Sequence, residues 1–168
     1  MNHSVWLEVH LDSVLLWGFV GALLVTLITT SAQAFGLSRM SLPFILGTAL
    51  TANRDRALAL GFGLHLMIGW LLAFLYALLF ENLGRADVVL GAFIGLVHGL
   101  ILLVVVFPLV PSFHPRMARE YEGPTSRRVL EPLGFFGRNY GRATPLIALA
   151  SQVLYGAILG GFYRTMGA

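Results

Sequence analysis

The sequence predicts an all-α membrane protein, a bundle of four transmembrane helices. Apolar side chains make up 57% of its 168 residues and charged side chains only 11%, whereas about a quarter of the residues in a soluble domain are charged. The mean hydropathy is +0.80, and four stretches without any Asp, Glu, Lys or Arg are long enough to cross a bilayer. This composition excludes a soluble enzyme, a nucleic-acid-binding module and a disordered tail, because too little polar surface is available to keep the chain in water.

The four predicted spans are separated by loops that carry most of the charge. A helix rises 1.5 Å per residue, so about 20 apolar residues cover about 30 Å of hydrocarbon. The spans are expected at 14–37, 57–80, 88–110 and 145–163. The first is not expected to be a cleaved signal peptide, because its leader carries Glu8 and Asp12 and no basic residue. The chain 1–168 is therefore predicted to be a single integral membrane domain.

The distribution of arginine predicts the orientation. All eleven basic residues are Arg, and nine of them lie in the first loop (38–56) and the third loop (111–144), which share one side. Only Arg85 and Arg164 lie on the other side. Loops rich in basic residues remain in the cytoplasm. We therefore expect a bacterial-type inner membrane protein with both termini outside, and the basic pI needs no nucleic acid as a partner.

The third loop is the largest segment outside the membrane, and its four prolines argue against one long helix. Its aromatic and basic residues are typical of an interfacial anchor, with rings at headgroup depth and guanidinium groups on lipid phosphates. The alternative is an ordinary positive loop lying on the membrane surface. The residues expected to contact lipid headgroups are Arg116, Arg119, Arg127, Arg128, Phe135, Phe136, Arg138, Tyr140 and Arg142.

Small or weakly polar residues recur at every fourth position in all four spans. Residues at i and i+4 share a helix face, and small residues let helix backbones approach closely in lipid. These small-xxx-small faces predict close packing within a four-helix bundle. The alternative is that at least one face pairs with a second copy of the chain. The rows are Gly18, Ala22, Thr26, Thr30 and Ala34; Gly61, His65, Gly69, Ala73 and Ala77; Gly91, Gly95 and Gly99; Ala148, Gln152, Gly156 and Gly160.

Polar side chains within these rows predict an intramembrane polar layer, because a polar group facing lipid would lack hydrogen-bond partners. Three uses are open for such a layer: hydrogen bonds that fix the packing, a haem b or metal ion held by His65 and His98, or a site for a quinone, a proton or another small molecule. The chain has no Cys, so thiolate metal sites are excluded. The residues of the predicted layer are His65, His98, Gln152, Thr26 and Thr30.

A second candidate site lies at the start of the third loop, where His114 is followed by Arg116, Arg119, Glu120 and Glu122. A His beside carboxylates could bind a metal ion or act as a general base on lipid. The alternatives are a solvated surface and lipid-headgroup binding by the Arg residues. No spacing in this region matches a catalytic or phosphate-binding motif.

Seven segments of the chain form a further pattern, at 43–48, 61–65, 69–70, 95–99, 114–117, 139–145 and 155–160. In these segments the chain resembles a family of small four-span bacterial membrane proteins of unknown function. The resemblance implies a multi-pass bundle and no particular activity. In that family a His often stands at the position of Gln152, so this chain departs from the pattern there, which weakens a three-histidine metal site.

The leading functional hypothesis is a non-enzymatic protein that binds a small hydrophobic molecule or supports a larger membrane complex. The alternative is a redox protein with haem b or a metal on His65 and His98, and a third hypothesis is a membrane enzyme that acts on lipid through the His114 region. Membrane lipid is the expected partner, with a homo-oligomer or a larger membrane complex as further possibilities.

Overall fold

The computed structural model describes residues 9–120 and 129–165, and these residues form an all-α protein. Four helical stretches are long and apolar enough to cross a membrane, which confirms the predicted fold class. The elements are α1 (Leu11–Ala34), α2 (Leu42–Leu50), α3 (Arg54–Leu83), α4 (Val88–Ile101), the π-helix η2 (Leu102–Val106), α5 (Phe107–Phe113), the 3₁₀ helix η3 (Phe135–Tyr140) and α6 (Thr144–Phe162).

The ends of the spans are set by capping groups that hydropathy does not reveal. α1 ends before Gly36, whose φ of +69° suits glycine and stops the helix short of the expected end at Leu37. α3 begins at Arg54 because the Asn53 side chain accepts a hydrogen bond from the Arg56 amide, and it ends at Gly84 with φ +63°. Its two charged end turns therefore extend the span beyond the apolar stretch 57–80.

The third span runs from Val88 to Phe113 as one continuous helical rod. It begins where Asp87 accepts a hydrogen bond from the Leu90 amide at 2.9 Å, and this bond holds the pKa of the exposed Asp87 carboxyl below its usual range. The rod widens to a π-helix just before Pro108. Proline lacks an N–H and collides with the carbonyl four residues earlier, and a wider turn gives that carbonyl room.

The short helix α2 lies within 38–56, which the sequence predicts to be a loop, so the prediction is wrong there. Ser41 caps it by accepting a hydrogen bond from the Phe44 amide, and Pro43 stands in its first turn. It lies antiparallel to the first half of α3: Gly47 faces Ala57, and Gly61 faces the carbonyl of Pro43. Nine residues are too few to span, so α2 covers only one end of α3.

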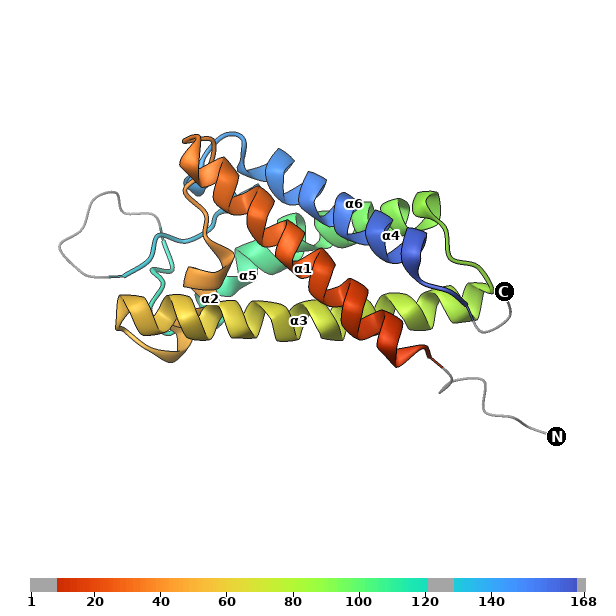
Figure 1. Ribbon diagram of the computed structural model, residues 1–168. Coiled ribbons are helices and arrows are strands. Elements are labelled where there is room, and N and C mark those ends of the chain that lie inside the picture. The colour runs from red at the N-terminus through yellow and green to blue at the C-terminus, as the bar shows by residue number, and fades with distance from the viewer. Residues whose placement is uncertain (1–8, 121–128, 166–168) are drawn as a thin grey trace.

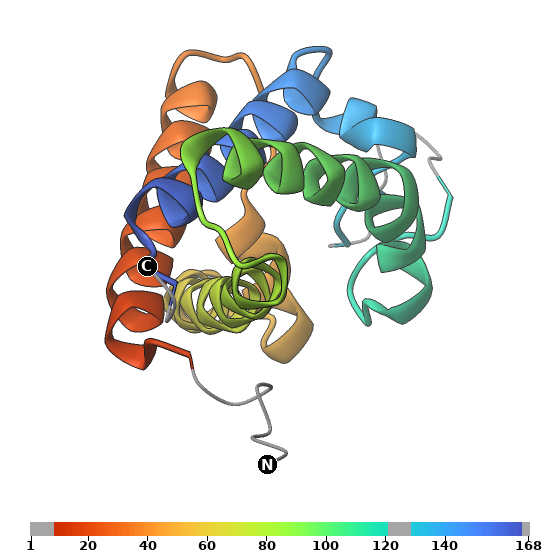
Figure 2. The same ribbon diagram turned by 90° about the vertical axis from the view of Figure 1, so that its right-hand side faces the viewer.

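The four long helices pack in the order α4–α6–α1–α3, with α2 against α3. Figure 1 shows the two ends of the molecule. One end, here called the Arg-rich end, holds the end of α1, α2, the start of α3, the end of α5 and the start of α6; the terminal end holds the beginning of α1 and the end of α6. Figure 2 looks nearly along α3, while α1 and α4 run across that view. The axes of α1 and α4 are therefore steeply inclined to the axis of α3.

Two apolar clusters form the core, one towards each end. The cluster at the terminal end joins α1, α3 and α6 and includes Tyr76, Phe80 and Tyr155. The cluster at the Arg-rich end joins α2, α5, α6 and the third loop and includes Ile45 and Phe107. α2 and the third loop thus fill the space where α3 and α5 diverge (Figures 1 and 2).

Candidate functional site

His65 on α3 is the most unusual polar residue inside the membrane-spanning part. Its ring lies close to the backbone of Ala22 on α1. Its Nε2 atom is buried and has no hydrogen-bond partner among the described residues. α3 can bring the ring this close because Gly69, one turn further on, lies against Ala22 and leaves no side chain between the two helices.

A small cavity adjoins His65 at the junction of α1, α3 and α6. It has a volume of about 30 Å³, and its walls include Val25, Gly69, Gln152 and Tyr155. Tyr155 donates its hydroxyl hydrogen to the Gly69 carbonyl at 2.5 Å. The structure therefore brings His65 and Gln152 to the same cavity, as two members of the predicted polar layer.

His98 on α4 belongs to a different level of the molecule. Its Nδ1 shares a hydrogen bond of 3.2 Å with the Tyr76 hydroxyl. Tyr76 lies eleven residues beyond His65 on α3, which is about 16 Å along the helix. Tyr76 also meets Tyr155 edge to face, with 5.7 Å between ring centroids. Tyr155 also lines the cavity beside His65, and neither tyrosine belongs to the polar layer predicted from the sequence.

The two threonines of the predicted layer, Thr26 and Thr30, differ in burial: Thr26 is half-buried and Thr30 is exposed. The Thr26 hydroxyl donates to the Ala22 carbonyl of its own helix at 2.9 Å. Thr30 is exposed, so its assignment to the interior is wrong. Four residues advance a helix by 400°, so a row of every fourth residue drifts about 40° per step and leaves the buried face. Thr29 takes the buried place instead, 3% exposed.

The interior does not fit a haem or a multi-ligand metal centre. A cavity of about 30 Å³ beside His65 is far below the about 300 Å³ of a typical cofactor site. One ring nitrogen of His98 is engaged by the Tyr76 hydroxyl. Within the described part of the chain, no three His, Asp or Glu side chains group as metal ligands. We therefore assign no cofactor chemistry to these residues.

At the Arg-rich end, His114 and Arg116 hold the end of α2. His114 Nε2 donates to the Ile45 carbonyl at 2.9 Å, and its Nδ1 accepts the Arg116 backbone N–H at 3.2 Å. The Arg116 NH1 nitrogen donates to the Thr48 carbonyl at 2.8 Å and to the Ala49 carbonyl at 3.2 Å. These bonds satisfy the last carbonyls of α2, and the cation suits the negative end of the helix dipole.

An apolar groove lies beside this cap. It has a volume of about 360 Å³ and runs between α5 and the end of α2. Apolar side chains line it throughout, except at one end, where His114 stands. The π-helix and Pro108 displace α5 from a straight α4 axis, and α2 supplies the opposite wall. The lining residues are Ala49, Val106, Leu109, Val110, Phe113 and His114.

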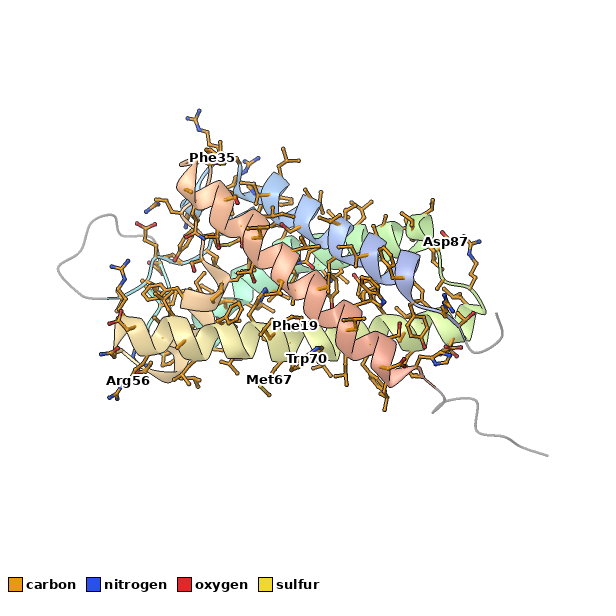
Figure 3. The ribbon with its side chains drawn as sticks, in the orientation of Figure 1. Phe19, Phe35, Arg56, Met67, Trp70 and Asp87 are labelled. Carbon is orange, nitrogen blue, oxygen red and sulfur yellow. The ribbon has the colours of Figure 1, made fainter. Side chains whose placement is uncertain are left out.

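Most of the other residues predicted to contact lipid headgroups lie at the surface. Arg119, Phe135, Arg138 and Arg142 are exposed, and Phe136 is half-buried against the Phe135 ring. Figure 3 shows the neighbouring Arg56 at the same end of the molecule, and Asp87 at the opposite end. Arg127 and Arg128 lie outside the described residues.

Tyr140 does not have the interfacial position predicted for it. Its side chain is 8% exposed within the core cluster of the Arg-rich end. Its hydroxyl donates to the Glu131 carbonyl at 2.8 Å, and the Arg39 guanidinium lies 5.8 Å from its ring centroid. Burial, with the Glu131 charge nearby, raises the pKa of Tyr140 to about 12. Glycine-assisted turns at 134, 137 and 141 fold the loop back over α5 and bury this ring.

No family model, no curated protein and no solved structure matches the chain. The resemblance to four-span bacterial membrane proteins therefore stays a prediction. What the structure establishes is a multi-pass membrane protein by its four apolar helices, with lipid in contact with their outer faces.

Proposed function

We propose that the chain is a non-catalytic membrane protein that binds an anionic phospholipid, with one acyl chain in the groove between α2 and α5. The volumes of the polar-layer cavity and of the groove indicate which of them can hold the acyl chain. The cavity of the polar layer, about 30 Å³, is too small for a hydrophobic ligand, while the groove offers about 360 Å³. The groove is the single observation on which the proposal depends.

The end of the groove supplies the polar part of the site. Arg116 lies at the wall formed by Ala49, whose carbonyl it binds. Only its NH1 nitrogen is engaged; NH2 and Nε make no hydrogen bond within residues 9–120 and 129–165. A half-buried guanidinium that has unused donors, and that no carboxylate of the described residues pairs with, suits a phosphate. The apolar groove and the cation together match an amphiphile with a negative headgroup.

The charge asymmetry supports a place in the cytoplasmic leaflet of a bacterial-type inner membrane. Nine Arg lie on the side of the first and third loops, and such loops remain cytoplasmic, with both termini outside. Anionic lipids attract basic segments at that surface. Association with a second copy or with a larger membrane complex stays a prediction.

Two features count against the other hypotheses. Both ring nitrogens of His114 are occupied by structural hydrogen bonds, so the ring has no free nitrogen to act as a base on lipid. The space beside His65 does not admit a haem.

The test is lipid retention in native mass spectrometry, with phosphatidylglycerol or phosphatidylcholine added to the detergent-solubilised protein. Leu109→Trp places a large ring in the groove from a position that is 49% exposed. We expect retention of phosphatidylglycerol to weaken about tenfold, equivalent to about 1.4 kcal/mol. The matched control is Leu154→Trp on the outer face of α6, at 40% exposure, and it should retain lipid like the parent. Equal retention by both variants, or no preference for phosphatidylglycerol, would contradict the proposal.

A further inference from the structure

We propose that the cavity between α1, α3 and α6 is a binding site for one water molecule, which bridges His65 Nε2 and the Gln152 side-chain amide. This site is separate from the lipid groove, and neither proposal depends on the other. Three properties of the cavity support it: the hydrogen-bonding state of His65, the size of the space, and the side chains that surround it.

The hydrogen bonds fix what the ligand must offer. In a neutral imidazole, Nε2 either donates or accepts a hydrogen, according to the tautomer. In His65 this atom is buried and has no hydrogen-bond partner in the described chain. The ligand must therefore be able to donate or to accept a hydrogen, and water does both.

The neighbouring groups cannot take this role. The Tyr155 hydroxyl is committed to the Gly69 carbonyl, and the Thr26 hydroxyl is committed to the Ala22 carbonyl. Gln152 lines the cavity and is 7% exposed, and its amide both donates and accepts. A molecule between His65 and Gln152 can form hydrogen bonds with both the imidazole and the amide.

The volume limits the ligand to one small molecule. A space of about 30 Å³ holds a single water, which needs at least about 10–15 Å³, and excludes a quinone or a hydrated metal ion. A buried polar atom left unpaired costs free energy, and the surrounding lipid offers it no hydrogen-bond partner. Bound water is the ordinary way to satisfy such a group when two polar partners line the space.

The first experiment is water-edited nuclear magnetic resonance of the full chain in lipid, with ¹⁵N-labelled histidine. We expect magnetisation to pass from water to the His65 ring, and an Nε2 chemical shift typical of a hydrogen-bonded ring nitrogen. Gln152→Leu removes one polar wall and should abolish the transfer. Gln33→Leu, which removes an amide on α1 bonded to its own helix, should leave it unchanged. No transfer in the parent protein, or equal transfer in all three proteins, would overturn the proposal.

A second variant separates a hydrated cavity from an empty one. Val25 lines the cavity, and Val25→Ile adds one methyl group to that wall. If the space holds water, the methyl group displaces it, leaves Nε2 unpaired and lowers the melting temperature by several degrees. If the space is empty, the same methyl group fills a void and raises the melting temperature, which would refute the bound water.

Discussion

Gly156→Leu is expected to separate α6 from α4 and to prevent stable folding. A Cβ atom on Gly156 would overlap the carbonyl oxygen of Gly91 and lie 3.0 Å from the Cα of Gly95. Both obstacles are backbone atoms, which cannot rotate away as a side chain can. Because even one extra methylene in a packed interior costs about 1–3 kcal/mol, a leucine here should cost about 3 kcal/mol or more. Thermal unfolding in detergent, followed by circular dichroism, measures the loss.

The control for this variant is Ala150→Leu on the same helix. Ala150 is exposed, so the added side chain extends into detergent or lipid and should leave the melting temperature within a few degrees of the parent. A melting temperature for Gly156→Leu close to that of Ala150→Leu would show that α4 and α6 do not meet through these glycines.

Gly61→Ala is expected to detach α2 from α3. A Cβ atom at Gly61 would overlap the Pro43 carbonyl oxygen and lie 2.7 Å from the Gly47 nitrogen. We expect a loss of about 1–3 kcal/mol. Because the chain has no Cys, a single Ile45→Cys substitution can report the detachment. Ile45 is 5% exposed, so the thiol should react slowly with a maleimide in the parent background and at least tenfold faster beside Gly61→Ala.

The same helix supplies the matched control, Gly63→Ala. A Cβ atom there meets nothing within 4 Å, and alanine favours a helix over glycine by about 0.5–1 kcal/mol. This variant should keep the thiol protected and unfold at the parent temperature or slightly above it. Equal labelling rates in the two alanine variants would contradict the antiparallel packing of α2 on α3.

The sequence predicts the four spans because length and hydropathy depend on local composition alone. It misplaces their ends where a capping side chain or a glycine decides them, as at Asn53 and Gly36. α2 carries a start signal in its sequence, Ser41 followed by Pro43, but its nine residues fall below the length of a span. Whether such a segment folds back on a neighbouring helix depends on a contact such as Gly61 with Pro43, which no local pattern contains.

The site residues were predicted less well than the spans, because their roles depend on which helices meet. His65 and Gln152 share a cavity, but His98 pairs with Tyr76, three turns further along α3. No local pattern places α4 against that level of α3, because the crossing of the helices is set by tertiary packing. Tyr140 is a similar case. An aromatic residue among arginines is typical of a membrane interface, yet the folding of the third loop buries Tyr140. Buried tyrosines with hydroxyl partners, Tyr76 and Tyr155 among them, are the polar groups that the small-residue rows did not reveal.

The unequal lengths of α3 and α6 have a consequence for the surrounding membrane. α3 has 30 residues and α6 has 19, which correspond to about 45 Å and about 28 Å of rise. Phe19 and Trp70 meet where α1 crosses α3. Figure 3 shows that this crossing lies well away from the Arg-rich end, which Phe35 and Arg56 mark. A bilayer whose thickness matches α6 can accommodate α3 only if α3 tilts or its charged end turns stand in the headgroups. Hydrophobic mismatch should therefore make the protein's stability depend on acyl-chain length. We expect an optimum at an intermediate bilayer thickness, where the mismatch of α3 and that of α6 are both small.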